Sequence, residues 1–132
     1  MALRWYSNVV ETTDVSRLAR WWAEALDWQI VYEAADEVVI IPRWAEELSE
    51  RLTFQQTPPG LVFVLVEHEK QTKNRIHMDL APHTSEDRDA EIARLEGLGA
   101  TRIDVGQGPD VSWTVLADID GNEFCVLSSR DQ

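Results

Sequence analysis

The stretch RIHMDLAPHTSEDRDAEIARLEGLGATRIDVGQGPDVSWTVLADIDGNEFCVLSS (residues 75–129) decides the fold of this chain. Its pattern predicts a strand, a helix over 85–99 and three more strands, with a turn at 119–122 before the last. The same order of elements occupies residues 4–67, about 70 residues earlier, with its helix over 13–26. A βαβββ unit therefore occurs twice in the chain.

The composition predicts one globular domain over residues 1–132. Its first module covers about residues 4–67 and its second about residues 75–129. Of the 132 residues, 44% are hydrophobic, which is enough for a substantial core. We expect an α+β fold in which the two modules form a curved mixed sheet around a central cleft, with the helices on the outer face.

The charge and the cysteine content exclude several classes of partner. Twelve basic and 24 acidic residues give a net charge of −12, which disfavours nucleic acid and anionic membrane surfaces as partners. Cys125 is the only cysteine, so an internal disulfide is excluded and a reducing, cytoplasmic location is expected. The apolar run 61–66 is too short to span a bilayer.

An interruption at residues 43–60 separates two strands of the first module. Its segment WAEELSERL (44–52) has helical spacing, and Pro58, Pro59 and Gly60 end it. A short lid or edge helix and an inert surface excursion explain this segment equally well.

Two pieces of the second module carry a resemblance to a known family. KNRIHMDLAP (73–82) and VLADIDGNEFCVL (115–127), the second preceded by a helix ending in GLGA, resemble the glyoxalase-like branch of the vicinal oxygen chelate superfamily. That superfamily includes glyoxalase I, fosfomycin- and bleomycin-resistance proteins and extradiol dioxygenases. The resemblance covers nearly the whole chain and implies the fold more specifically than any activity.

The resemblance also implies where a metal would lie. In metal-using members each module supplies one ligand from its first strand, often His, and one from its last strand, often Glu. The matching positions here are Ser7, Val64, His77 and Cys125. A valine cannot bind a cation and a thiol is not a carboxylate, so we expect no metal and no cofactor.

The cleft is nevertheless expected to be chemically distinctive. Because side chains alternate along a strand, Arg75, His77 and Asp79 share one face, and Glu123 shares a face with Cys125. The first module adds an apolar wall, which favours a small amphiphilic ligand. The expected ligand-binding residues are Ser7, Val9, Val64, Arg75, His77, Trp113, Glu123 and Cys125.

Several of these residues have a purely structural explanation that is left open. A hydrogen bond to Asp79, Glu123 or the backbone explains His77 about as well as direct contact with a ligand does. The carboxylates of Asp79 and Glu123 have a structural explanation too, because they could neutralise the charge of Arg75 or Lys73. A cysteine in mid-strand, such as Cys125, is more typical of a small buried hydrophobe than of a nucleophile.

Two functions from different classes follow. The first is a protein that binds a small molecule, an antibiotic or a metabolite, without the usual metal quartet. The second is an enzyme: a lyase or isomerase with His77 and either Asp79 or Glu123 as acid and base, or a metalloenzyme with non-standard ligands. In both cases we expect a homodimer, because a curved open sheet leaves edges to be covered.

Overall fold

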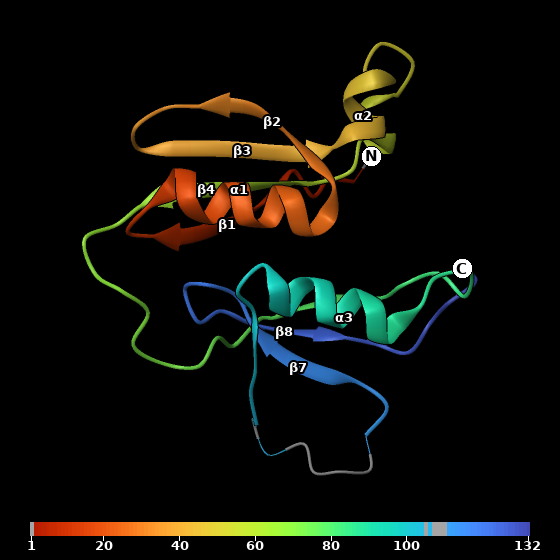
Figure 1. Cartoon of the computed structure of the whole chain (residues 1–132). Coiled ribbons are helices and arrows are strands. Elements are labelled where there is room, and N and C mark those ends of the chain that lie inside the picture. The colour runs from red at the N-terminus through yellow and green to blue at the C-terminus, as the bar shows by residue number, and fades with distance from the viewer. Residues whose placement is uncertain (1, 105, 107–110) are drawn as a thin grey trace. The chain divides into compact units, whose positions relative to one another are not determined.

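The computed structural model describes residues 2–104, 106 and 111–132. The chain divides into two compact units, Met1–Glu69 and Lys70–Gln132, and each has its own sheet (Figure 1). None of the helices in these described residues is long and apolar enough to cross a membrane.

The first unit contains four strands and a central helix. In chain order its elements are β1 (Ser7–Thr12), α1 (Val15–Leu26), β2 (Trp28–Glu33), β3 (Glu37–Pro42), α2 (Arg43–Glu47), the 3-10 turn η1 (Phe54–Gln56) and β4 (Gly60–Leu65). The strands lie in the order β1-β4-β3-β2, with β1 parallel to β4 and the other pairs antiparallel.

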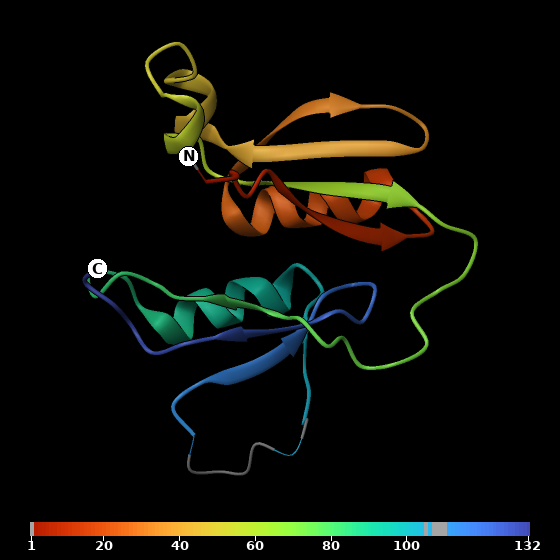
Figure 2. The ribbon, with the colours of Figure 1, turned by 180° about the vertical axis from the view of Figure 1, so that it is seen from behind.

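The second unit repeats this arrangement. Its elements are β5 (Met78–Leu80), α3 (Arg88–Gly97), β6 (Thr101–Arg102), β7 (Thr114–Ala117) and β8 (Glu123–Val126). The order is β5-β8-β7-β6, again with the first and last strands of the module parallel (Figure 2). The predicted α+β class with two tandem βαβββ modules is confirmed, while a sheet shared around a central cleft stays a prediction.

Helix α1 forms the core of the first unit. Its first turn is capped by the Asp14 carboxylate, which accepts a hydrogen bond from the amide of Arg17 at 3.2 Å. The helix ends at Asp27, which adopts a left-handed conformation with φ of 54°. Its buried face comprises Val15, Leu18, Ala19, Trp21, Trp22 and Ala25, the 3.6-residue spacing expected of a helix that packs on a sheet.

Helix α3 begins later than the sequence suggests. The sequence predicts a helix over 85–99, but the Asp87 carboxylate caps the helix by accepting a hydrogen bond from the amide of Ala90. The residues before it form a turn in which the amide of Ser85 donates to Nδ1 of His83. This local side-chain bond competes with helix formation and delays the first turn.

The interruption at 43–60 packs against the N-terminal segment of its own unit. The Arg4 guanidinium lies over the rings of Tyr6 and Phe54, with centroids 4.3 and 4.5 Å away, and its Nη1 donates to the Phe54 carbonyl. The side-chain Nε2 of Gln55 donates to the Ala2 carbonyl. Helix α2 is shorter than the predicted helical run, and whether the segment acts as a lid stays open.

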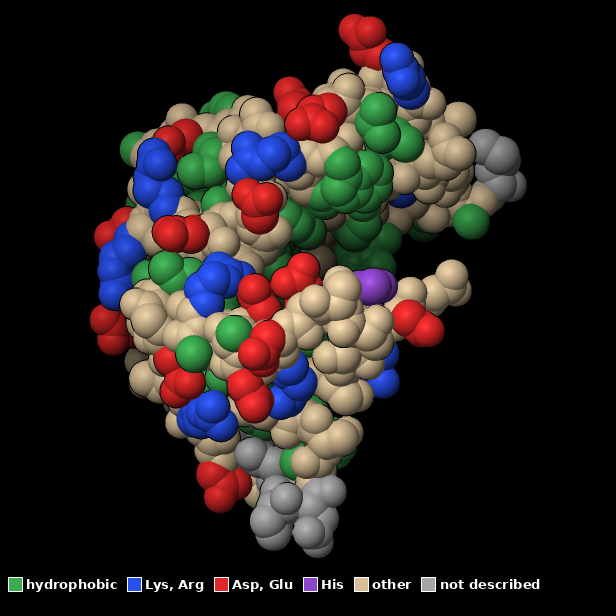
Figure 3. Space-filling model, turned by 45° about the vertical axis from the view of Figure 1, so that its right-hand side comes forward, with side chains coloured by type: hydrophobic (Ala, Val, Ile, Leu, Met, Phe, Trp, Pro, Cys, Tyr) green, Lys and Arg blue, Asp and Glu red, His purple; other side chains and the backbone are tan. Residues whose placement is uncertain are grey.

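Charged side chains of both signs lie on the face of the molecule drawn in Figure 3. On the face shown in Figure 3, Asp and Glu side chains lie among Lys and Arg side chains and do not gather into one acidic patch. On this face the acidic side chains are therefore partly balanced by neighbouring basic ones.

Candidate ligand-binding site

The second unit contains a pocket of about 410 Å³. Strands β5, β7 and β8, together with the segments that flank them, supply its walls. The lining residues are Lys73, His77, Asp79, Gly106, Trp113, Val115, Glu123, Cys125 and Leu127. This volume lies within the range of about 300–1,000 Å³ that is typical of small-molecule sites.

Strand pairing explains which side chains reach the pocket. Strands β5 and β8 run parallel, with Asp79 opposite Cys125 and Met78 opposite Phe124. Because side chains alternate, Phe124 enters the core, where only 1% of it is exposed, while Cys125 turns to the pocket. The predicted shared face of Glu123 and Cys125 lines the pocket, whereas Ile76 is 87% exposed because it precedes the start of β5.

Three side chains in the pocket form a mixed cluster. Nε2 of His77 lies 3.3 Å from Oδ1 of Asp79, and ligand atoms of His77, Asp79 and Cys125 all lie within 4.8 Å of one another. The side chains of His77 and Asp79 are about half exposed, whereas Cys125 is 6% exposed. The cluster is therefore open to solvent on one side and anchored in the core on the other.

The thiol of Cys125 is held in its protonated form. Burial raises the pKa of Cys125, and the adjacent Asp79 carboxylate raises that pKa further by its charge and its hydrogen bond. A protonated thiol is a weak nucleophile. Cys125 therefore lacks the activation that a catalytic cysteine needs.

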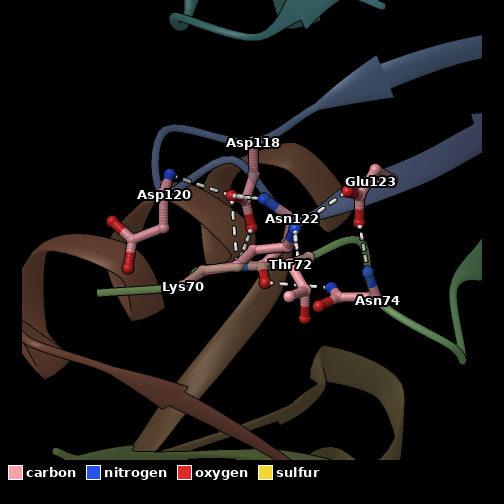
Figure 4. A network of polar contacts seen from close by, with 7 residues as sticks. All are labelled: Lys70, Thr72, Asn74, Asp118, Asp120, Asn122 and Glu123. Carbon is pink, nitrogen blue, oxygen red and sulfur yellow. Dashed lines mark hydrogen bonds and ion pairs between the residues drawn. The ribbon is translucent and has the colours of Figure 1, made fainter. Parts of the chain in front are cut away.

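Glu123 is tied to the segment before β5. Its carboxylate lies 2.8 Å from the Lys70 ammonium and accepts from the Asn74 amide at 3.0 Å (Figure 4), and Lys70 also donates to the Thr72 carbonyl. Burial acts to raise the pKa of Glu123, but the hydrogen bonds from Lys70 and Asn74 outweigh it and lower that pKa. The cation that pairs with Glu123 is thus Lys70, and not Arg75 or Lys73 as the sequence suggested.

The turn that leads into β8 is organised by Asp118, which the sequence analysis did not single out. Its Oδ1 accepts from the amides of Asp120 and Asn122, both at 2.9 Å (Figure 4). Asn122 in turn accepts a 3.0 Å bond from the Asn74 side chain, and Gly121 has the positive φ of 86° that the turn requires. An Asp at the start of D-x-D-G-N is the sequence signal that would have predicted this turn.

The pocket brings together only part of the expected ligand-binding set. His77, Trp113, Glu123 and Cys125 line it, as does Asp79 from the expected acid–base set. Arg75 is exposed and outside the lining, and Ser7, Val9 and Val64 belong to the first unit. Lys73, Val115 and Leu127 line the pocket although they were not among the expected ligand-binding residues.

The register of the strands decides which residue of the first module corresponds to Cys125. In the second module Asp79 pairs with Cys125, and in the first module Val9 pairs with Val62 while Val64 pairs with Glu11. If Ser7 corresponds to His77, then Val9 corresponds to Asp79 and Val62 to Cys125. The position is still a valine, so the first module offers no side-chain ligand there.

Comparison with known proteins gives the family. The model of the Glyoxalase-like domain family matches residues 7–127, which is most of the chain. The chain belongs to the Glyoxalase-like domain family. The family match agrees with the resemblance seen in the second module and extends over both βαβββ modules. None of the curated proteins compared with the sequence matches it significantly.

Solved structures share the fold of this glyoxalase-like chain at low identity. A glyoxalase/bleomycin resistance protein/dioxygenase family enzyme from Burkholderia phytofirmans PsJN is 13% identical, with a TM-score of 0.71 over 97% of this chain and 100% of that one. The fosfomycin resistance protein FosX from Mesorhizobium loti is 15% identical, with a TM-score of 0.64 over 96% of this chain and 92% of that one. FosX from Listeria monocytogenes, in complex with Mn(II) and sulfate, is 12% identical, with a TM-score of 0.70 over 98% of this chain and 93% of that one.

The donor set decides which metal this glyoxalase-like domain suits. Among the described residues, His77, Asp79 and Cys125 form the group that could hold an ion. Oxygen-rich sites suit Mn²⁺ and Mg²⁺, whereas a site with one thiol and one imidazole suits Zn²⁺. The residues present therefore do not fit the His and Glu quartet that the resemblance implies, but they do fit a cation that accepts sulfur.

Proposed function

We propose that this glyoxalase-like protein binds a small organic molecule, an antibiotic or a metabolite, in the pocket of its second unit. The observation that carries the proposal is the two-sided lining of a pocket of about 410 Å³. Trp113, Val115 and Leu127 offer apolar surface, and Lys73 and His77 are among the groups that offer polar contacts. The usual metal quartet has no part in this proposal.

Magnitudes favour an amphiphilic ligand. Burial of about 100 Å² of apolar surface contributes roughly 2.5 kcal/mol at about 25 cal/mol per Å². Micromolar affinity requires about 8 kcal/mol. Since Lys70 already neutralises Glu123, the remaining binding free energy falls to Lys73, His77 and Asp79, which would orient a polar end of the ligand.

Tryptophan fluorescence tests this proposal. A panel of aromatic carboxylates and amines, with fosfomycin included, is titrated into the wild type and into the Trp113→Phe and Trp44→Phe variants. Trp44 is a matched control because it is 49% exposed in the first unit, against 39% for Trp113 in the pocket. We expect a saturable change in the wild type and Trp44→Phe that is lost or strongly reduced in Trp113→Phe. An equal response in all three proteins would contradict binding beside Trp113.

One observation supports a second function, acid–base catalysis of a lyase or isomerase type. Nε2 of His77 lies 3.3 Å from Oδ1 of Asp79, an arrangement in which a carboxylate orients and polarises an imidazole that faces a pocket. Asp79 suits this role better than Glu123, whose carboxylate is engaged by Lys70 and Asn74. If a substrate is found, His77→Ala should abolish its turnover; undiminished turnover would exclude His77 as the base.

We further propose that the protein is a cytoplasmic homodimer. The single cysteine supports a reducing compartment, and the unpaired edge strands within each open sheet support association. Size-exclusion chromatography with light scattering should give about twice the chain mass of 15.1 kDa. A mass close to that of one chain across the micromolar range would contradict the dimer.

A further inference from the structure

We propose that His77, Asp79 and Cys125 form a binding site for a thiophilic divalent cation, Zn²⁺ foremost, within the second unit alone. The three side chains converge in the pocket, with their ligand atoms within 4.8 Å of one another. The proposal does not depend on the organic ligand, because it rests on this convergence and not on the apolar wall.

The spacing of the donor atoms suits a tetrahedral ion. With bond lengths of about 2.0–2.2 Å to nitrogen and oxygen, two tetrahedral ligands lie roughly 3.4 Å apart. Nε2 of His77 and Oδ1 of Asp79 are 3.3 Å apart, so these two atoms already have the required separation. The widest separation in the cluster is at most 4.8 Å, which exceeds this ideal by up to about 1.4 Å, and a change of side-chain torsion on exposed His77 or Asp79 can close it.

The backbone holds two of the ligands in register. Asp79 and Cys125 are directly opposite each other in the parallel pair β5 and β8, and Cys125 is nearly fully buried. A ligand pair on adjacent strands is preorganised, so little conformational entropy is lost when an ion binds. His77 immediately precedes β5 and completes the cluster from the solvent side.

The choice of cation follows from the donors. Imidazole, carboxylate and thiolate together are a ligand set that Zn²⁺ accepts, whereas Mg²⁺ and Mn²⁺ prefer oxygen ligands throughout. Binding would displace the thiol proton of Cys125 to solvent as the metal–sulfur bond forms. Three protein ligands leave a fourth position of the ion open to the pocket.

The surrounding charges set a limit on affinity. Asp79 and a Cys125 thiolate supply two negative charges, while Lys73 lines the same pocket and opposes a cation. Glu123 adds little, because Lys70 lies 2.8 Å from its carboxylate. We therefore expect one ion per chain and a measurable, reversible affinity.

Cobalt titration of the full-length protein tests the site without any substrate. The chain is purified with a non-coordinating reductant, stripped with a chelator, and titrated with Co²⁺, which reports thiolate ligation by near-ultraviolet charge-transfer absorption. We expect this band to saturate at one equivalent and to be bleached by Zn²⁺. Cys125→Ser should abolish the band, and His77→Ala and Asp79→Asn should each weaken Co²⁺ binding at least about tenfold.

The matched control is His68→Ala, which removes an exposed histidine of the first unit and should titrate like the wild type. Because His77 and Asp79 are about half exposed, their variants should fold, which circular dichroism and thermal melting would verify. Absence of the band in the wild type would overturn the site. So would wild-type affinity in folded His77→Ala and Asp79→Asn, since the thiol would then bind the metal alone. A wild-type protein that shows the cobalt band but no fluorescence response to the ligand panel would contradict organic-ligand binding and leave the ion site standing.

Discussion

Asp79 and Cys125 face each other across the parallel strands β5 and β8, with the thiol hydrogen-bonded to the carboxylate. The two residues are 46 positions apart in sequence (125 − 79), so this contact exists only because the strands pair in this register. It keeps the thiol protonated and places a carboxylate beside it in the pocket. Much of the chemistry of the second unit follows from this one pair.

The first prediction concerns the reactivity of Cys125. Because burial and the Asp79 carboxylate raise the pKa of Cys125, its alkylation by iodoacetamide should require a higher pH than a free cysteine. Asp79→Asn removes the charge, so the pH midpoint of the alkylation rate should fall toward the ordinary thiol value. Mass-spectrometric rates across a pH series measure it. A midpoint at or below that of free cysteine in the wild type would contradict the effect of the Asp79 charge.

The second prediction concerns the Lys70–Glu123 pair, whose side chains are only 20% and 11% exposed. Lys70→Met leaves a largely buried carboxylate without its cationic partner, although the Asn74 amide still donates to it, and should lower the free energy of unfolding by about 1–3 kcal/mol at pH 7. Arg43→Met is the control, because the Arg43–Asp27 pair is 50% and 88% exposed and should be worth under about 1 kcal/mol. Equal losses in the two variants would contradict this ranking.

A pH dependence accompanies that pair and has a definite sign. The pKa of Glu123 is lowered from 4.5 in the folded chain, so its stabilisation is present above pH 4.5 and is lost as pH falls through the folded-state value. The stability difference between wild type and Lys70→Met should therefore shrink on acidification below that value. Urea unfolding at pH 7 and at several points below 4.5 measures it, and a difference independent of pH would refute the assignment.

The third prediction concerns Asp118, which is 4% exposed and organises the turn before β8. Asp118→Ala leaves the amides of Asp120 and Asn122 without their acceptor and should destabilise the chain by about 1–3 kcal/mol. Asp118→Asn keeps one acceptor oxygen and should lose less. Thermal unfolding of both variants supplies the comparison, and an Asn variant as unstable as the Ala variant would argue against the acceptor role.

The fourth prediction contrasts two glycines. At Gly60 an added Cβ would lie 3.0 Å from the Ile40 carbonyl oxygen and 3.1 Å from Cγ2 of Ile41, so Gly60→Ala should cost about 1–3 kcal/mol. At Gly97, in the last turn of α3, no atom lies within 4 Å of the added Cβ. Gly97→Ala should be neutral or stabilising by up to about 1 kcal/mol. Chemical denaturation of the two variants distinguishes them, and the reverse order would contradict the close approach of β3 and β4.

Short-range sequence patterns predict much of the architecture. Alternation of apolar residues in strands and the 3.6-residue spacing of Leu18, Trp22 and Ala25 in α1 depend on nearest neighbours, and the repeat of the whole pattern identified the fold. Turn chemistry at 118–122 is equally local. The boundaries were less accurate: α3 starts at Arg88, because His83 and Ser85 bond to each other first.

The site was only partly predictable, for a physical reason. Alternation along one strand correctly predicted that Glu123 and Cys125 share the face that lines the pocket, since that is a property of a single strand. Which strand lies opposite, and in which register, depends on long-range hydrogen bonds and core packing that no short segment encodes. The contact of Lys70 with Glu123, the shift from Val64 to Val62 and the meeting of Asp79 with Cys125 are all of this kind, so only the folded chain decides them.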